Sequence, residues 1–394
     1  MKILSIETSC DETGIALVEA SGGLSQPKFK VLKNLISSQI KIHRPFGGVV
    51  PNLAKREHLK NLPILYRQIF SEKGAKAKTK KVRIEDIDLI TVTVGPGLEP
   101  ALWAGIEFAK ELAQKCRKPL IGANHMEGHL YSFLLTDHRL QTTAQKAVVR
   151  SPSAVVRFPA IALIVSGGHT ILLRMDSLTK WKKLGETRDD AAGEAFDKVA
   201  RMLKLPYPGG PEIEKIALRG NPHAIAFPRP MLNTKDYDFS FSGLKTSVLY
   251  HIRGQNSQTN ADIARTNAEK GQRKSAYSQR QSADAADVAA SFQQAAIDVL
   301  VSKTVRAARE YEARAIILCG GVAANKSLRK RLKAECDMSH LTFYVPHIEY
   351  NTDNAAMIAA ASYFAYLREK KSAKGGSASG GKKLPLVANG DLEI

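Results

Sequence analysis

Short apolar runs alternate along the chain with segments of helical spacing, and several of the runs end at glycine turns. Runs rich in β-branched residues predict buried strands at 2–6, 89–94, 160–165 and 313–318. Residues 14–19 resume an apolar alternation after a polar turn, which predicts that the chain opens as a strand–turn–strand hairpin. Apolar residues three and four apart predict helices over 101–115 and 355–368. Strands that lead through glycine turns into helices indicate an α/β protein with sites at the carboxyl ends of its strands.

Three polar segments interrupt this pattern and hold much of the positive charge. Residues 253–283 are rich in Gln, Asn, Ser, Arg and Lys and predict a long surface insertion or loop. The tail from Lys370 on combines Gly, Ser and Lys without a core-forming pattern, which predicts a flexible segment. A third basic patch lies at 73–83. Because the charge lies in loops and tail, the pattern does not indicate a helix that reads a nucleic-acid groove.

The charge balance is strongly basic. The 394 residues include 58 Lys and Arg against 38 Asp and Glu, which gives a formal net charge of +20. This balance favours a polyanionic partner such as nucleic acid or a membrane surface, and basic loops that only aid solubility are the alternative. The apolar content of 44% excludes global disorder, and the length suggests two or three domains of ordinary size.

Neither a membrane span nor a disulfide framework is expected. No apolar run approaches the roughly 18 residues that a transmembrane helix needs. The chain begins directly with a strand-like run interrupted by Glu7, without the pattern of a secretory signal. The four cysteines, Cys10, Cys116, Cys319 and Cys336, have no CxxC spacing. This usage argues against a zinc ribbon and fits a reducing cytoplasm.

The most specific chemical feature is the histidine pair in His125-Met-Glu-Gly-His129. Residues four apart on a helix lie about 40° apart around its axis, so both imidazoles would face one way, as two metal ligands do. Two polar helix histidines without a metal are the alternative. A zinc-protease motif needs Glu directly after the first histidine. Glu127 lies about 200° away around the helix and is poorly placed to act as a base on the same face.

A third metal ligand must come from elsewhere in the chain. Asp353 lies at the start of the last predicted helix and offers a carboxylate oxygen, although capping that helix would be its simpler role. Two histidines and one carboxylate would leave coordination positions open for substrate and would suit Fe(II) or Zn(II).

Glycine loops and acidic residues are the remaining candidates. The loops 166–170 and 320–325 each follow a buried strand, so their backbone N–H groups could hold a phosphate, although such loops are more often plain turns. Asp11 and Glu12 lie in the first turn, and 189–197 adds further carboxylates that could hold hydroxyls, amines or a metal. For each of these acidic residues taken alone, a role in helix capping or as a solvent-exposed charge is as good an interpretation as a binding role.

Ten short motifs follow one another over residues 1–368. They are Ile6-Glu-Thr-Ser-Cys-Asp-Glu-Thr13, Gly47-Gly-Val-Val-Pro51, Gly95-Pro-Gly-Leu98, His125-Met-Glu-Gly-His129, Val165-Ser-Gly-Gly-His-Thr170, Asp189-Asp-Ala-Ala-Gly-Glu-Ala-Phe-Asp-Lys198, Tyr207-Pro-Gly-Gly210, Asp238-Phe-Ser-Phe-Ser-Gly-Leu-Lys245, Gly320-Gly-Val-Ala-Ala-Asn325 and Thr352-Asp-Asn-Ala-Ala-Met357. In this order they resemble the bacterial-type TsaD (Gcp/Kae-type) family of tRNA N6-adenosine threonylcarbamoyltransferases. The inactive TsaB paralogue lacks the histidine pair.

The resemblance implies a two-lobed actin-like ATPase/sugar kinase/chaperone (ASKHA) fold with a central cleft. Residues 1–122 would form an N-terminal α/β lobe, and the final helix 353–368 would pack back on it. Residues 123–352 would form a C-terminal α/β lobe with the polar insertion 253–283. Residues 369–394 would be a flexible basic tail.

The resemblance also implies an acyl transfer. The threonylcarbamoyl group would pass from threonylcarbamoyl-AMP to N6 of adenosine 37, just 3′ of the anticodon, in tRNAs that read ANN codons, with release of AMP. The partners would be tRNA, a TsaB-type paralogue and a TsaE-type ATPase, in the cytoplasm and without a membrane. The basic segments would steer the tRNA backbone without base specificity, so deletion of 370–394 would weaken tRNA binding.

The site residues carry over from the matching motifs. His125, His129 and Asp353 would hold one divalent metal, with Fe(II) expected and Zn(II) as the alternative. Asp11 and Glu12 match acidic positions at the catalytic cleft. Substrate contacts carry over to Ile164, Val165, Ser166, Gly167, Gly168, Asp197, Gly210, Glu214 and Asn325.

Some positions depart from the family pattern, and two other functions compete with the transfer. Asn52 replaces the usual Glu, Glu99-Pro100 replaces small residues, and Trp103 is bulky, all in the region where the family packs against TsaB. A metallopeptidase, a label this family once carried, is disfavoured by the position of Glu127. A non-catalytic ATP-binding partner protein is disfavoured by the intact histidine pair.

Overall fold

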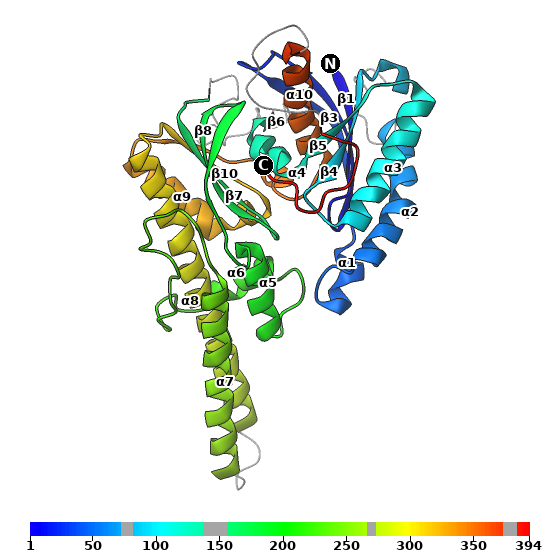
Figure 1. Cartoon of the computed structure of the whole chain (residues 1–394). Helices are drawn as coiled ribbons and strands as arrows, with labels where there is room; N and C mark the ends of the chain where they lie inside the picture. The colour runs from blue at the N-terminus through cyan, green and yellow to red at the C-terminus, as the bar shows by residue number, and fades with distance from the viewer. Residues whose placement is uncertain (72–81, 137–155, 266–272, 373–383) are drawn as a thin grey trace.

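Two mixed β-sheets, each covered by helices, form the two lobes of the computed structural model (Figure 1). The structure describes residues 1–71, 82–136, 156–265, 273–372 and 384–394, with the backbone alone for 255–265, 273–283 and 371–372. Of the predicted basic patch at 73–83, all but the last two residues lie outside the described part of the chain.

The N-terminal lobe is built on a six-stranded sheet in the order β5-β4-β1-β2-β3-β6. Its strands are β1 (Lys2–Glu7), β2 (Glu12–Ser21), β3 (Lys28–Ser38), β4 (Leu89–Gly95), β5 (Leu120–Asn124) and β6 (Leu135–Thr136). β1 and β2 pair antiparallel, so the predicted opening hairpin is confirmed. β1, β4 and β5 are parallel, which brings their carboxyl ends to one edge of the sheet. The sheet extends beyond the predicted lobe boundary at residue 122, because β6 pairs with β3.

Helices cover both faces of this sheet. α2 (Pro51–Ile69) and α3 (Glu99–Cys116) share one core with it, and α4 (His125–Tyr131) and α10 (Ala355–Ser372) share a second core on the opposite face. Neighbouring β1 residues divide between the two: Leu4 packs under α2 and α3, whereas Ile3 packs toward α10. This division explains why β1 is an almost continuous apolar run.

The C-terminal lobe contains a five-stranded sheet in the order β11-β10-β7-β8-β9. Its strands are β7 (Ala160–Val165), β8 (Thr170–Ser177), β9 (Lys180–Glu186), β10 (Ala315–Cys319) and β11 (Thr342–Tyr344). One face packs on α5 (Ala192–Met202), α6 (Gly209–Ala217), α8 (Arg273–Glu310) and α9 (Lys326–Met338). The other face shares a core with α4, α10 and the first sheet, so α10 lies between the lobes (Figure 1).

Short helical turns connect these elements. They are α1 (Ile40–His43), η1 (Arg44–Phe46), η2 (Ile84–Asp86), η3 (Ser132–Leu134), η5 (Gly321–Ala324) and η6 (Ile348–Tyr350). Among the helices of the described residues, none is both long enough and apolar enough to cross a membrane.

The polar segment 253–283 is helical over most of its length, so its prediction as a loop was wrong. α7 (Ser242–Arg265) and α8 form two long helices that extend away from the lobes (Figure 1). The segment contains no proline and is rich in Ala, Gln, Arg and Lys, which favour helices. Polarity argued against burial, but it did not argue against a helix.

The C-terminal tail is not flexible throughout, which corrects the prediction for 369–394. α10 continues to Ser372, and the last eleven residues, Leu384 to Ile394, pack on the N-terminal lobe. Their even-numbered positions are apolar or glycine and the odd-numbered positions face outward. This alternation was present in the sequence, but the Gly, Ser and Lys residues before it obscured it.

Candidate metal centre

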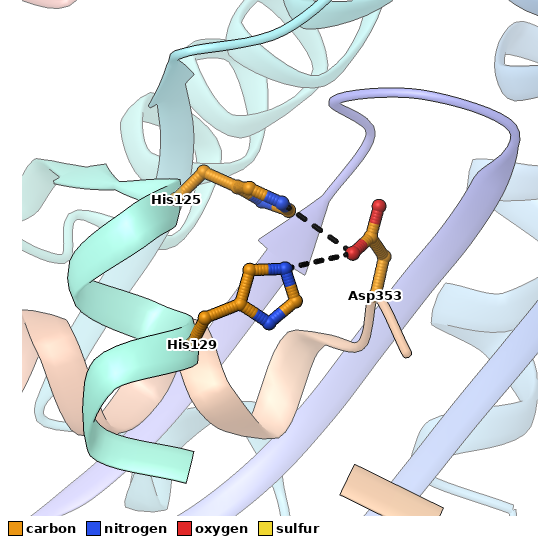
Figure 2. Close-up of side chains that lie close together, drawn as sticks. All are labelled: His125, His129 and Asp353. Atoms are coloured by element: carbon orange, nitrogen blue, oxygen red, sulfur yellow. Dashed lines mark ion pairs between the residues drawn. The ribbon is translucent and has the colours of Figure 1, made fainter. Parts of the chain in front are cut away.

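Three side chains from two distant segments meet where α4 and α10 approach each other. Figure 2 shows His125 and His129 on α4 facing the Asp353 carboxylate. Nε2 of His125 lies 3.4 Å from Oδ1 of Asp353, and Nε2 of His129 lies 3.2 Å from the same oxygen. The three ligand atoms lie within 4.8 Å of one another. Both imidazoles are buried and the carboxylate is partly exposed, so a bound ion would be reached from the Asp353 side.

Two asparagines set the local geometry of these ligands. Oδ1 of Asn124 accepts hydrogen bonds from the N–H groups of Met126 (2.8 Å) and Glu127 (3.1 Å), so α4 begins at the first histidine. At α10, Oδ1 of Asn354 accepts from the N–H of Met357 at 3.0 Å. Asn354 therefore caps the helix, and Asp353 is free to face the histidines.

A buried carboxylate that the sequence prediction missed holds the first histidine. Oε2 of Glu7, at the end of β1, lies 3.1 Å from Nδ1 of His125. Glu7 also accepts hydrogen bonds from Thr93 Oγ1 and from the N–H of Ser9, each at 2.5 Å. This contact orients the ring so that Nε2 points at Asp353. The signal in the sequence was one charged residue inside an otherwise apolar strand.

A proton on His125 balances the negative charges of Asp353 and Glu7 in the centre. Burial disfavours its protonation, but Asp353 and Glu7 outweigh burial and raise the pKa of His125 to about 10. Burial lowers the pKa of His129. Burial would raise the pKa of Asp353, but both histidines outweigh it and hold that pKa well below its usual range.

The donor set fits a transition-metal ion. Neither ring nitrogen of the buried His129 has a hydrogen-bond partner among the described residues, although Nε2 approaches Asp353. A divalent cation bound by the lone pair of one of these nitrogens would supply the partner that the buried ring lacks among the described residues. Two imidazoles and a carboxylate suit Fe(II) or Zn(II).

Asp11 ends the turn between β1 and β2, and Glu12 is the first residue of β2, next to this centre. Burial and the charges of Asp11 and Asp353 raise the pKa of Glu12 well above its usual range. Oδ2 of Asp11 is buried without a hydrogen-bond partner among the described residues. The turn thus concentrates negative charge that a proton, a cation or a substrate donor would relieve.

The two glycine loops of the C-terminal lobe converge. A Cβ added to Gly320 would lie 2.4 Å from the carbonyl oxygen of Val165, so the ends of β7 and β10 touch. Side chains of Ile164 and Val165 are buried in two different cores, which leaves only their backbone for a ligand. Gly167 and Gly168 have no neighbouring atom within 4 Å of an added Cβ, so a ligand can approach their backbone. Ser166 is buried, and its carbonyl accepts from the N–H of Gly193 at 3.3 Å.

Asp197 lies within α5 and Glu214 within α6, and each contacts the first residue of another helix. Oδ1 of Asp197 accepts from the N–H of Gly209 at 2.6 Å, beside the open backbone of Gly210. Burial raises the pKa of Asp197, and the Asp11 charge of the other lobe adds to this. Glu214 accepts from the N–H of Lys326 at 2.6 Å.

Asn325 uses both of its polar atoms inside the protein. Its Oδ1 caps α9 by accepting from the N–H of Leu328 at 2.9 Å, and its Nδ2 donates to Gln293 at 2.8 Å. One N–H of Nδ2 and one acceptor position of Oδ1 are left over from these two bonds, so the side chain can contact a ligand without giving up either of them.

Glu127 does not face the metal centre. Its carboxylate lies 2.8 Å from Nη2 of Arg368 on α10, in an ion pair of low exposure, and the guanidinium of Arg368 lies over Trp181. Burial raises the pKa of Glu127, partly offset by Arg368. The pair joins α4 to α10 and leaves Glu127 unable to serve as the base of a metallopeptidase.

Comparisons with known proteins agree with these features. The family model described as TsaD, tRNA N6-adenosine threonylcarbamoyltransferase, matches residues 30–360. Two curated relatives bear that same name. The protein from Thermosipho melanesiensis is 46% identical over 363 residues, 92% of this chain and 94% of the relative. The protein from Moorella thermoacetica is 45% identical over 369 residues, 93% of this chain and 92% of the relative.

Among solved structures, T. kodakarensis HypF matches with a TM-score of 0.53 at 14% identity, over 94% of this chain and 48% of that chain. This likeness concerns the fold alone, and it confirms the predicted two-lobed ASKHA architecture. Because the family model spans most of the sequence and the relatives align almost end to end, the chain belongs to the TsaD family of tRNA N6-adenosine threonylcarbamoyltransferases.

Proposed function

We propose that this protein transfers the threonylcarbamoyl group of threonylcarbamoyl-AMP to N6 of adenosine 37 in tRNAs that read ANN codons and releases AMP. The observation that carries this proposal is the meeting of His125, His129 and Asp353 in a chain of the TsaD family. The acidic turn and the open glycine loops of the facing lobe supply the remaining groups that such a transfer needs.

A divalent ion held by His125, His129 and Asp353 would supply Lewis-acid polarisation of a substrate oxygen. We propose Fe(II) as the resident ion, with Zn(II) as the alternative. Glu7 keeps Nε2 of His125 directed at the site through its own contact with Nδ1.

The residues of the chain would position two reactants and accept one proton. The uncrowded backbone at Gly167, Gly168 and Gly210 suits the phosphate or ribose of the AMP portion. N6 of the adenosine attacks the carbamoyl carbon, a C–N bond forms, and the bond from that carbon to the AMP phosphate oxygen breaks. The N6 proton passes to the Asp11–Glu12 turn, since burial and neighbouring charge raise the pKa of Glu12.

Asp197, Glu214 and Asn325 would act mainly by fixing the walls of the substrate site. Each already holds a backbone N–H at the start of a helix or a neighbouring segment. Direct contact from Asp197 to a ribose hydroxyl is compatible with its hydrogen bonds to the backbone of Gly209 and Gly210, because a carboxylate has about four acceptor positions.

A TsaB-type partner would bind the N-terminal lobe. Phe46 (62% exposed), Leu59 (52%) and Ile64 (45%) present apolar surface on and beside α2. A groove of about 720 Å³ between α2 and α3, lined in part by Tyr66 and Phe108, adds to it. Exposed apolar area of this kind is typical of protein interfaces. A TsaE-type ATPase and a cytoplasmic location belong to the same proposal.

Reconstitution tests the function. Purified protein, threonylcarbamoyl-AMP and unmodified tRNA are combined with and without TsaB- and TsaE-type proteins, and the modified nucleoside is measured by mass spectrometry. We expect transfer by the wild type and by His223→Ala, which alters an exposed histidine outside the site. His125→Ala should lose both bound metal and transfer. No modified nucleoside in any combination would refute the assignment, and full transfer by metal-free His125→Ala would refute the metal's role.

A further inference from the structure

The last eleven residues form an extended segment that lies against the N-terminal lobe beside the metal centre. In Figure 1 its red trace passes near β4 and ends close to α4. Leu384, Leu386 and Leu392 pack against the core under α3 and β4. Val387, between two of these anchors, is 49% exposed. The segment, here called the C-terminal segment (Leu384–Ile394), thus has one docked face and one solvent face.

The C-terminal segment is hydrogen-bonded to the end of β4 and to the loop that follows it. The N–H of Asn389 donates to the carbonyl of Val94 at 2.8 Å, and the N–H of Gly97 donates to the carbonyl of Gly390 at 3.2 Å. A Cβ added to Gly95 would lie 2.0 Å from the carbonyl oxygen of Asn389. The end of β4 therefore fits this segment only because glycine stands at that position.

The same loop supports a residue that touches the first metal ligand. The N–H of Leu98 donates to the carbonyl of Ser9 at 2.8 Å, and a Cβ on Gly97 would lie 2.6 Å from that carbonyl oxygen. Oγ of Ser9 lies 3.2 Å from Nδ1 of His125. One continuous set of contacts thus runs from the C-terminal segment through the loop and Ser9 to the imidazole.

A second route runs through the cap of α4. Nδ2 of Asn124 donates to the carbonyl of Glu393 at 2.9 Å, while Oδ1 of the same side chain caps the helix that begins with His125. The carboxylate of Glu393 also lies 3.7 Å from Lys183 of the other lobe, but both groups are too exposed for this pair to contribute much. The orientation of Asn124 is therefore fixed from two sides.

We propose that the C-terminal segment is a positioning element of the metal centre, which holds the His125 ring in place through the loop after β4 and through Asn124. This proposal rests on the metal site of the proposed function. Groups one contact removed from a metal ligand commonly change metal affinity by about 10- to 100-fold. The C-terminal segment acts one contact further out through Asn124 and two further out through the loop and Ser9, so we expect the lower end of that range.

A matched pair of substitutions tests the proposal in the full chain. Leu386→Asp places a charge on the docked face, and Val387→Asp places the same charge on the adjacent solvent face. Affinity for Zn(II) is measured at fixed pH by competition with a chromophoric chelator. We expect about tenfold weaker binding for Leu386→Asp and wild-type affinity for Val387→Asp.

Deletion of Leu384–Ile394 should weaken Zn(II) binding to the same degree, and a synthetic peptide of these residues added in trans should restore it. A purely structural cover would instead lower the unfolding temperature of the zinc-free protein and leave the affinity of the folded protein unchanged. That result in both Leu386→Asp and the deletion would overturn the proposal. If the deletion does not fold, the point-variant pair decides, with folding checked by circular dichroism.

Zn(II) binding needs neither tRNA nor threonylcarbamoyl-AMP, so the test is separable from the proposed transfer. A wild-type protein that binds Zn(II) but never modifies tRNA would refute the function and leave the role of the C-terminal segment measurable. Normal transfer together with equal Zn(II) affinity in all variants would refute the positioning role alone.

Discussion

Binding of Zn(II) to the metal centre at pH 8 should release close to one proton, and Glu7→Gln should lower that number. Burial opposes the charge on His125, but Asp353 and Glu7 raise its pKa to about 10, so the metal-free ring carries a proton at pH 8. A metal ion needs the nitrogen lone pair and must displace that proton. His129 contributes none, because burial lowers its pKa. Apparent affinity should therefore rise about tenfold per pH unit and level off near pH 10.

Glu7→Gln keeps the size of the side chain and removes one of the two charges that hold the proton. The carboxylate lies 3.1 Å from Nδ1 of His125 and is fully buried, so little solvent screens it. We expect the midpoint of proton release to fall by at least one pH unit, equivalent to about 1.4 kcal/mol. At high pH, where proton competition ends, loss of the orienting contact should leave Zn(II) binding about 10- to 100-fold weaker.

Titration calorimetry in buffers of different ionisation enthalpy gives the number of protons released. Glu107→Gln, an exposed carboxylate paired with Lys110 on α3, is the control and should match the wild type. No proton release by the wild type at pH 8 would refute the reasoning. Equal release by Glu7→Gln across the pH range would refute the role of Glu7.

Protonation of His125 also affects the stability of the metal-free protein. This stability should fall as the pH rises, whereas metal affinity rises. The folded-state pKa of His125 lies above the unfolded value of 6.5, so its stabilising charge is fully present below that pH and is lost as the pH rises through about 10. The unfolding temperature of metal-free protein should fall between pH 7 and 10, and it should fall less in Glu7→Gln.

Two further predictions concern the contact between α4 and α10. Gly128→Val should destabilise the fold by about 1–3 kcal/mol, because even a Cβ there would lie 3.0 Å from Cδ1 of Ile358. Gly243→Val is the control, since the nearest atom to its added Cβ is at 3.7 Å, and equal unfolding temperatures would contradict the packing argument. Glu127→Gln should lower the free energy of unfolding by about 3–5 kcal/mol, because the largely buried Arg368 then loses its ion pair. The double variant Glu127→Gln/Arg368→Met should recover part of this loss, as measured by denaturant unfolding. An unchanged unfolding midpoint in Glu127→Gln alone would show that the ion pair does not stabilise the fold.

Short-range features of this protein could be predicted because their causes lie within a few residues. The opening hairpin follows from two apolar runs around a polar turn, and the shared direction of His125 and His129 follows from their spacing of four on a helix. The buried strands 89–94 and 160–165 likewise follow from short β-rich runs before glycine turns.

The metal centre needed more than local pattern. Asp353 was a good candidate ligand, but the sequence could not decide between ligand and helix cap, because its neighbour Asn354 is an equally good cap. Glu7 was visible only as an interruption of an apolar strand. Its partner, His125, lies on another element, and only the pairing of β1, β4 and β5 brings the two together.

Two segments show where composition alone misled. Residues 253–283 are polar, and the sequence prediction took polarity as a sign of a loop, whereas helix propensity depends on side-chain entropy and backbone competition. The end of the chain carries an alternating pattern, but an alternation does not name the surface that it will cover.

The sequence by itself determined the buried strands, the opening hairpin and the residue types that could bind a metal, because periodicity and side-chain chemistry are local properties. The tertiary structure alone decided that Glu127 pairs with Arg368, that Glu7 holds His125, and that the C-terminal segment docks beside β4. Each of these pairings joins residues far apart in the chain. Their choice depends on which buried charges and uncovered edges remain once the two sheets have formed, and no single segment encodes that outcome.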